Sequence, residues 1–210
     1  MKITLAICTN REVKPKTVSS LLEMVAHSKE IDWHILVASR GYTVAENRNY
    51  CAVQAQKNGS DYLLFIDDDM TFPKDTLERL LGANKEVVGV NSYSRVLPLS
   101  PTTGLMDKDG KYMHPDYHMP YEMKIPDELF KAYFVGCGVC LIDMKVFEKI
   151  KKPWFTFKAH KNGGIIHGED GWFCEQVKKA GMDVWCDGTI PIFHIGEYLY
   201  GKIEENELNK

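Results

Sequence analysis

The stretch TVAENRNYCAVQAQKNGSDYLLFIDDDM, residues 43–70, decides the fold class of this sequence. It opens with a capping box, in which the Thr43 hydroxyl and the Glu46 carboxylate satisfy free backbone amides, so a helix is expected from here to about Lys57. The apolar run at residues 62–66 predicts a strand that is too apolar to face water. A helix followed directly by a buried strand is typical of α/β layer folds with a largely parallel sheet.

The same alternation of short apolar runs and amphipathic runs continues on both sides of this stretch. Strands are expected at residues 3–8, 33–38, 87–91, 132–142, 184–186 and 190–195, and helices that open at Pro15, Lys74, Asp143 and Glu169. The first of these helices is expected to bury Val18, Leu21, Leu22 and Val25. The pattern predicts a single α/β domain over residues 1–200, with a mostly parallel central sheet flanked by helices, and a polar tail at residues 201–210.

Composition excludes several classes of protein. The 210 residues are 44% hydrophobic and 26% charged, as in an ordinary globular domain. The net charge of −3 argues against a protein that simply coats nucleic acid or an anionic membrane. The first residues are not expected to act as a secretory signal, and no apolar stretch approaches the roughly 18 to 20 residues of a membrane span. The six cysteines are too sparse for a disulfide scaffold. A cytoplasmic protein with reduced thiols and no membrane span is therefore expected.

Three carboxylates, Asp67, Asp68 and Asp69, directly follow the central strand. Such a cluster is costly unless a cation or several hydrogen-bond donors lie opposite it. Side chains alternate along an extended chain, so Asp67 and Asp69 are expected on one side and Asp68 on the other. Two hard oxygen ligands on one side suit Mg²⁺ or Mn²⁺. The alternative is an acidic turn that caps the next helix.

Three stretches resemble the family 2 glycosyltransferases of the GT-A fold. Residues 43–70 are similar to the family's nucleotide-sugar half, with an Arg-Asn pair on a helix and an Asp-x-Asp motif after a strand. Residues 168–196 are similar to its acceptor half, in which a Glu-Asp pair starts a helix and a histidine follows the last strand, and residues 134–150 resemble the glycine-containing strand and helix between them. The resemblance implies a Rossmann-related, GT-A-like fold with a nucleotide-sugar-binding half at residues 1–91 and an acceptor half at residues 92–200.

The resemblance also implies roles on the donor side. Asp69 would ligate Mn²⁺ or Mg²⁺, and Asp67 would contact the ribose or the water of the metal, so that it too belongs to the metal site. His194 would complete that site, although a lone histidine at a strand end is otherwise structural. Further contacts with the nucleotide sugar are expected from Thr9, Arg11, Arg48, Asn49 and Asp68. The first two lie on a strand end, Cys-Thr-Asn-Arg, that departs from the family's proline-containing pattern.

On the acceptor side, Asp170 matches the family's catalytic base, which takes the proton of the acceptor hydroxyl. Glu169 would orient the acceptor or Asp170 itself. Both could instead be ordinary acidic residues at a helix N-terminus. Trp172, one turn into the same helix, could stack on an acceptor sugar or could belong to the core.

These roles imply an enzyme that moves a sugar from a nucleotide diphosphate sugar to a hydroxyl acceptor, with inversion because a base-like Asp170 is present. The acceptor could be a glycan, a lipid carrier, a protein or a modified nucleic acid. Alternatives are a retaining transferase of the same fold, a non-catalytic nucleotide-sugar-binding protein, and a metal-dependent phosphohydrolase built on the three aspartates.

Other patterns have more ordinary interpretations. Residues 92–126 lack periodicity and are rich in proline and tyrosine, so we expect this loop to order over a bound donor. Cys137 and Cys140 have the CxxC spacing but lack a second pair, which favours structural thiols over zinc. The lysines and aromatics of residues 145–161 favour a solvated helix face and a packed loop over a site for nucleic acid or a phosphorylated carrier lipid.

Overall fold

The predicted alternation of strands and helices is present in the computed structural model, which describes residues 1–39, 41, 43–95, 99–112, 124–159 and 161–196. Along the chain the elements are β1 (Lys2–Cys8), α1 (Pro15–His27), β2 (Asp32–Ala38), α2 (Val44–Asn58), β3 (Tyr62–Asp67), β4 (Met70–Thr71), α3 (Thr76–Gly82), β5 (Val87–Val90), β6 (Leu129–Lys131), β7 (Val139–Asp143), α4 (Val146–Lys149), β8 (Lys158–Ala159), β9 (Ile165–His167), α5 (Glu169–Lys179), β10 (Trp185–Asp187) and β11 (Phe193–His194). Helix α2 begins with the expected capping box and ends at Gly59, whose φ of 66° is left-handed.

The central sheet has the strand order β2-β1-β3-β7-β5-β10-β6. Strands β1, β2, β3, β5 and β10 run in one direction, and β7 and β6 run against them. Because β7 from the second half of the chain lies between β3 and β5 from the first half, the sheet is common to both halves. The mostly parallel, single-domain α/β architecture is therefore confirmed, while a functional division at residues 1–91 and 92–200 stays a prediction.

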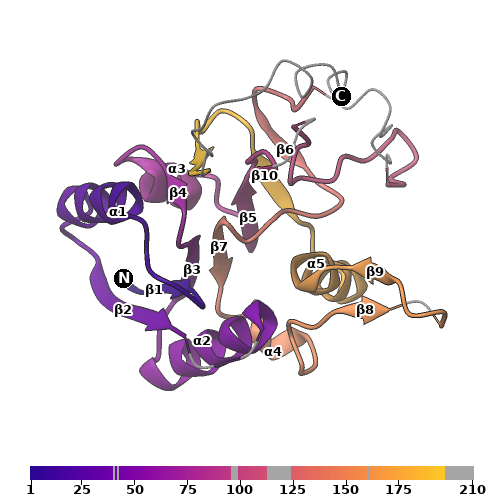
Figure 1. The fold of residues 1–210 in the computed structure, drawn as a ribbon, viewed down its shortest axis with the longest axis horizontal. Coiled ribbons are helices and arrows are strands. Elements are labelled where there is room, and N and C mark those ends of the chain that lie inside the picture. The colour runs from indigo at the N-terminus through magenta and orange to yellow at the C-terminus, as the bar shows by residue number, and fades with distance from the viewer. Residues whose placement is uncertain (40, 42, 96–98, 113–123, 160, 197–210) are drawn as a thin grey trace, which may run out of the picture.

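Helices cover both faces of this sheet (Figure 1). On one face α1 and α3 pack onto it through side chains such as Met24 and Leu77. On the other face α2, α4 and α5 pack onto it through Ala52, Phe147 and Phe173. Each large apolar side chain buried in these layers stabilises the fold by about 1.5 to 3 kcal/mol.

The topology brings several chain segments to one edge of the sheet. Strands β1 and β3 pair in parallel with Cys8 opposite Asp67, so residues that follow either strand lie near each other. The short ribbon of β4 and β11 pairs Met70 with His194 and returns the C-terminal part of the described chain to this edge. Ligands of open α/β sheets bind at such carboxyl ends of strands.

The strand predicted at residues 132–142 is wrong in its first part. Strand β6 ends at Lys131 and β7 begins only at Val139. These two strands are not neighbours, since β5 and β10 lie between them, so the chain needs residues 132–138 to cross from one position to the other. A period-2 apolar pattern cannot reveal such a crossing, because the crossing segment is also buried at Val135 and Cys137.

The predicted buried face of α1 is also partly wrong. The helix buries Thr17, Leu21 and Met24, whereas Val18 and Leu22 are 39% and 66% exposed. The buried stripe is rotated by about one position from the predicted one, because α1 packs over β1 and β3 and its outer side meets solvent.

Cys137 and Cys140, the pair with the CxxC spacing, are both buried, and neither forms a disulfide. The aromatic loop before β8 is packed at Trp154 and Phe155, which are both 1% exposed. The expected ordering of loop 92–126 involves residues 96–98 and 113–123, which lie outside the described residues, as does the expected tail. Among the helices that the structure describes, none combines the length and the apolar character needed to cross a bilayer.

Candidate active site

The three consecutive aspartates do not continue β3. The strand ends at Asp67, and Asp68 and Asp69 form a turn, so the alternation expected for an extended chain stops there. Asp68 accepts a hydrogen bond from the hydroxyl of Thr9 at the end of β1. The same hydroxyl oxygen accepts the backbone N–H of Arg11 at 2.9 Å, and the Arg11 side chain is exposed. These two hydrogen bonds join the end of β1 to the acidic turn after β3, and the predicted contacts of Thr9, Arg11 and Asp68 with a nucleotide sugar stay predictions.

Arg48, from α2, lies beneath the carboxylates and joins both halves of the chain. Its Nη2 donates to Asp67 Oδ1, its Nε donates to Glu169 Oε1, and its Nη1 donates to the carbonyl of Cys137, each at 3.2 Å. The side chain is only 3% exposed. A guanidinium is suited to this position because its donors diverge in a rigid plane, so that one buried group reaches three acceptors. The predicted contact of Arg48 with the nucleotide stays a prediction.

Burial and proximity of like charges shift the ionisation of this group of residues. Burial raises the pKa of Asp67, against the opposing effect of Arg48. Burial and the neighbouring Asp170 carboxylate raise the pKa of Glu169 to about 7, and Arg48 again opposes the shift. For Arg48 burial alone would lower the pKa, but Asp67 and the other nearby acidic groups raise it well above its ordinary value. Arg48 therefore stays charged, while Glu169 can hold a proton near neutral pH.

Asp170 lies on the first turn of α5, next to Glu169 but with a different environment. Its Oδ2 accepts the backbone N–H of Cys137 at 3.1 Å, and the residue is half-buried, whereas Glu169 is only 7% exposed. Cys137 thus donates to Asp170 and accepts from Arg48 through its backbone alone. The helix N-terminus also favours a negative charge here. Of the two acidic residues, Asp170 is thus the more exposed, and its predicted role as a base stays a prediction.

Asp69 forms the other part of the site with Arg95 and His194. Its Oδ2 accepts from Arg95 Nη1 at 2.5 Å, and its Oδ1 lies 3.8 Å from His194 Nε2. His194 Nδ1 lies 2.6 Å from the carbonyl of Tyr93. Because a carbonyl only accepts, Nδ1 carries a proton, so that the ring in its neutral form would present the lone pair of Nε2 toward Asp69.

A carboxylate oxygen and an imidazole lone pair that face each other fit a divalent cation. Metal-binding histidines commonly donate one ring N–H to a backbone carbonyl, as His194 Nδ1 does to Tyr93, and bind the metal through the other ring nitrogen. Within the described ranges, however, no three or more Asp, Glu, His or Cys side chains form a group that could hold a metal ion. Asp69 and His194 therefore fit a cation whose remaining ligands come from water and from the phosphates of a substrate, which is the usual mode for Mg²⁺.

The predicted contacts of Asn49 and Trp172 are placed differently. The Asn49 amide donates to the carbonyl of Phe155 at 2.6 Å, and its oxygen accepts the backbone N–H of Trp154 at 3.0 Å. Trp172 Nε1 donates to the carbonyl of Pro153 at 3.4 Å. Both side chains hold the same loop, so Asn49 could bind a nucleotide only by giving up these bonds.

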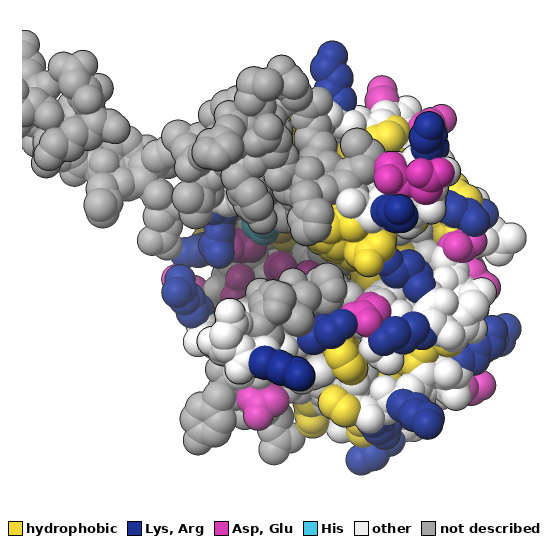
Figure 2. Space-filling model, turned by 90° about the vertical axis from the view of Figure 1, so that its right-hand side faces the viewer, with side chains coloured by type: hydrophobic (Ala, Val, Ile, Leu, Met, Phe, Trp, Pro, Cys, Tyr) yellow, Lys and Arg dark blue, Asp and Glu magenta, His cyan; other side chains and the backbone are white. Residues whose placement is uncertain are grey.

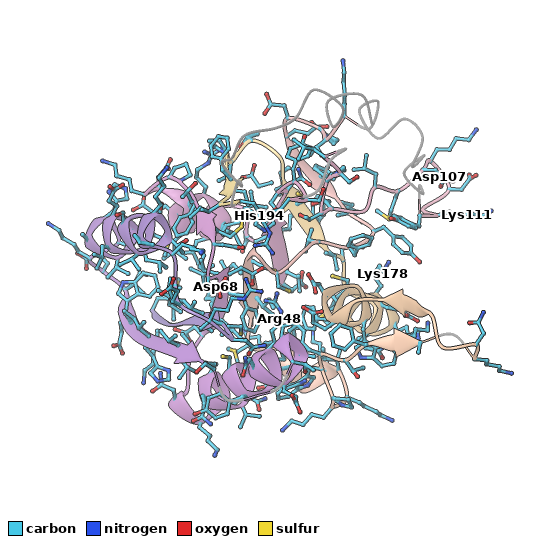
Figure 3. All side chains as sticks on the ribbon, viewed as in Figure 1. Arg48, Asp68, Asp107, Lys111, Lys178 and His194 are labelled. Carbon is cyan, nitrogen blue, oxygen red and sulfur yellow. The ribbon has the colours of Figure 1, made fainter. Side chains whose placement is uncertain are left out.

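The figures agree with this layout. In Figure 3 the labelled Arg48, Asp68 and His194 lie together at the centre of the molecule, away from Asp107 and Lys111. Figure 2 shows a hollow in which acidic side chains and a histidine lie next to lysine or arginine side chains.

Sequence reasoning missed Arg95 and the backbone of Cys137. Cys137 was assigned to a continuous strand, which hides its free carbonyl and amide. Arg95 lies in an aperiodic loop, where only its position shortly after β5, a strand of the same sheet, could have indicated it.

Comparisons with known proteins bear on the fold and on the family. No curated protein matches the chain. Among solved structures, A197 from STIV superposes with a TM-score of 0.58 at 18% identity, covering 94% of this chain and 87% of that one. GalNAc-T7, solved with UDP, GalNAc and Mn²⁺, superposes with a TM-score of 0.52 at 12% identity, covering 93% of this chain and 44% of that one.

At such identities these likenesses establish the fold, which is the GT-A-like fold expected from the sequence. The sequence profile described as Glycosyl transferase family 2 matches residues 7–151, well over half of the chain. The protein is therefore a glycosyltransferase, and it belongs to glycosyl transferase family 2.

Proposed function

We propose that this enzyme transfers a sugar from a nucleotide diphosphate sugar to a hydroxyl acceptor, with inversion at the anomeric carbon. The observation that carries the proposal is the position of Asp170. This half-buried carboxylate is held by the Cys137 amide, and Arg48 ties its neighbour Glu169 to Asp67 at the end of β3. A candidate base and a candidate donor site are thus joined by one buried side chain.

On the donor side, Asp69 and His194 would hold Mn²⁺ or Mg²⁺, with Asp67 close by. A cation bound there would neutralise charge that develops on the departing diphosphate. GalNAc-T7 was solved with UDP and Mn²⁺, which supports a divalent cation in this fold. Thr9 and Asp68 border the same edge and would contact the nucleotide, with Arg11 beside them.

On the acceptor side, Asp170 would accept the proton of the acceptor hydroxyl. At the same time the hydroxyl oxygen would bond to the anomeric carbon of the sugar, and the bond between that carbon and the diphosphate would break. The Cys137 amide stabilises the ionised form and fixes its orientation. Burial raises the pKa of Glu169 to about 7 and its side chain is bonded to Arg48, so it would position Asp170 rather than accept the proton. Trp172 would border the acceptor from the next turn of the helix.

Arg48 and Asn49 would act on the donor indirectly. Arg48 would orient Asp67, and Asn49 would hold the loop at residues 154–155. All six cysteines are buried and free, which supports the cytoplasmic location expected from the sequence because reduced thiols persist there.

The test begins with a panel of nucleotide sugars, screened by thermal shift with and without Mn²⁺. The donor that stabilises the protein is then incubated with candidate acceptors, and the anomeric configuration of the product is determined by NMR. We expect inversion. Retention would contradict the base assignment and make Asp170 an acceptor contact, and release of phosphate from simple esters without transfer would indicate a phosphohydrolase.

A further inference from the structure

Arg95 occupies a distinctive position in the site. Its guanidinium lies 2.5 Å from Asp69, the carboxylate that is best placed to hold a cation. The Arg95 side chain is 54% exposed, whereas that of Asp69 is 9% exposed. An exposed basic residue therefore covers a nearly buried acidic one.

The same short segment also holds the histidine. The carbonyl of Tyr93, two residues before Arg95, accepts the bond from His194 Nδ1. One segment after β5 thus contacts both members of the candidate cation pair, one through its backbone and one through a side-chain charge. Whether the negative charge of Asp69 is available to a cation therefore depends on where the Arg95 side chain lies.

Building on the proposed function, we propose that Arg95 couples cation binding to donor binding. While no donor is present, its guanidinium neutralises Asp69 and opposes a divalent cation there. Once cation and donor are bound together, the guanidinium pairs with the diphosphate of the donor.

The first half of the proposal follows from charge. Asp69 carries one negative charge, and the Arg95 guanidinium already offsets it. A divalent cation between Asp69 and His194 would lie within a few ångströms of that guanidinium, where like charges repel, by a modest amount because solvent surrounds the exposed part of Arg95. The cation should therefore bind weakly to the protein alone.

The second half follows from the chemistry of the ligand. A diphosphate brings at least two negative charges, and its oxygens match the planar fork of a guanidinium. Because the Arg95 side chain is 54% exposed, it can turn from Asp69 to a phosphate once a cation offsets the charge of Asp69. The divalent cation and the Arg95 guanidinium then both contact the diphosphate. Their attraction to this anion outweighs their repulsion of each other.

A different role for Arg95 would be purely structural, with the ion pair fixing the segment after β5. Such a role predicts no change in the intrinsic affinity of the folded protein for Mn²⁺ when Arg95 is replaced. The coupling role predicts changes of opposite sign for Mn²⁺ alone and for diphosphate with Mn²⁺.

The first arm of the experiment titrates Mn²⁺ alone into the wild-type protein and into Arg95→Gln, Arg95→Lys and Arg79→Gln, following free Mn²⁺ by electron paramagnetic resonance. Arg79 lies on α3 and donates to Thr189, so its replacement controls for the loss of one positive charge. We expect Arg95→Gln to bind Mn²⁺ at least about threefold more tightly, the scale of a partly exposed ion pair, and Arg95→Lys and Arg79→Gln to stay near wild type.

The second arm measures inorganic pyrophosphate with Mn²⁺ in excess, which requires no knowledge of the sugar or the base. Arg95→Gln should bind pyrophosphate about tenfold more weakly, as expected for loss of a charge-assisted contact, and Arg95→Lys should lie between. Equal Mn²⁺ affinity in Arg95→Gln and wild type would overturn the coupling, and so would equal pyrophosphate affinity.

Asp69→Asn separates this proposal from the proposed function. If Asp69→Asn abolishes Mn²⁺ binding while Arg95→Gln changes neither affinity, only the role of Arg95 is wrong. If Asp69→Asn leaves Mn²⁺ binding intact, the cation site itself is wrong, and the coupling falls with it.

Discussion

Two arginines pair with carboxylates at the same edge of the sheet, and they differ in how far their side chains are exposed to solvent. Arg48 is 3% exposed and contacts Asp67, Glu169 and the Cys137 carbonyl. Arg95 is 54% exposed and faces Asp69. The buried arginine comes from a well-formed helix, whereas the exposed one comes from a loop.

The difference in burial decides what each arginine can do. A buried ion pair cannot be given up without leaving an unpaired charge in a medium that solvates it poorly. An exposed pair contributes little, because water and salt replace the partner. We infer that the Arg48 network is a fixed part of the fold, while the Arg95 contact is exchangeable.

The largest effect is expected from breaking the buried Arg48 network. Arg48→Met should lower the free energy of unfolding by about 3 to 5 kcal/mol, since it leaves the buried Glu169 and the partly buried Asp67 without their shared partner. Urea unfolding followed by circular dichroism measures this loss. Arg48→Lys keeps the charge but not the diverging donors and should fall between. A loss below about 1 kcal/mol for Arg48→Met would show that the network is not fixed.

A second substitution tests the same network through the pH dependence of stability. The pKa of Glu169 rises from 4.5 to about 7 on folding, which corresponds to about 3 kcal/mol. Since this folded pKa is raised, the stabilisation by the protonated carboxyl is complete below pH 4.5 and is lost as the pH rises through 7. Glu169→Gln keeps an acceptor for Arg48 without this titration.

The stability of Glu169→Gln relative to wild type should therefore increase between pH 4.5 and about 8, as measured by urea unfolding at a series of pH values. Glu148→Gln, at an exposed position of α4, serves as the matched control and should show no such trend. A constant difference between Glu169→Gln and wild type across this range would contradict the raised pKa.

The third prediction tests whether Asp170, which lies beside the Arg48 network, acts in catalysis. Asp170→Asn should reduce sugar transfer by about a hundredfold or more, the scale of a positioned base, while donor binding stays close to wild type. Transfer is measured with the donor found in the nucleotide-sugar screen, and donor binding by calorimetry. Asp183→Asn, which removes a surface partner of Lys131, is the control. Near wild-type transfer by Asp170→Asn would leave the retaining mechanism as the better explanation.

The two sides also differ in how far the sequence predicts them. The carboxylates at the end of β3 and the acidic start of α5 follow from local patterns: an apolar run, a helix start, and the alternation of elements. The partners of those residues do not. Arg48 and Glu169 are 121 positions apart, so only the assembled fold shows that they meet.

Arg95 illustrates the stronger limit. Its contact with Asp69 spans 26 positions through a segment without periodicity, so no amphipathic pattern marks it. Residues 132–138 show the converse error, because a buried crossing between separated strands has the same apolar pattern as a strand. Periodicity reports burial, and it does not report which neighbours cause it.

The smallest effect on stability is expected from the exchangeable side. Arg95→Gln should change the free energy of unfolding by less than about 1 kcal/mol, because the lost ion pair is more than half exposed on the arginine side. The change should shrink further when the ionic strength is raised, since salt screens what remains. The measurement is urea unfolding at low and high salt, run beside Arg48→Met. A loss of 3 kcal/mol or more, independent of salt, would give Arg95 the same fixed role as Arg48. The cation and the donor would then have to be accommodated without moving it, and the distinction between the two arginines would disappear.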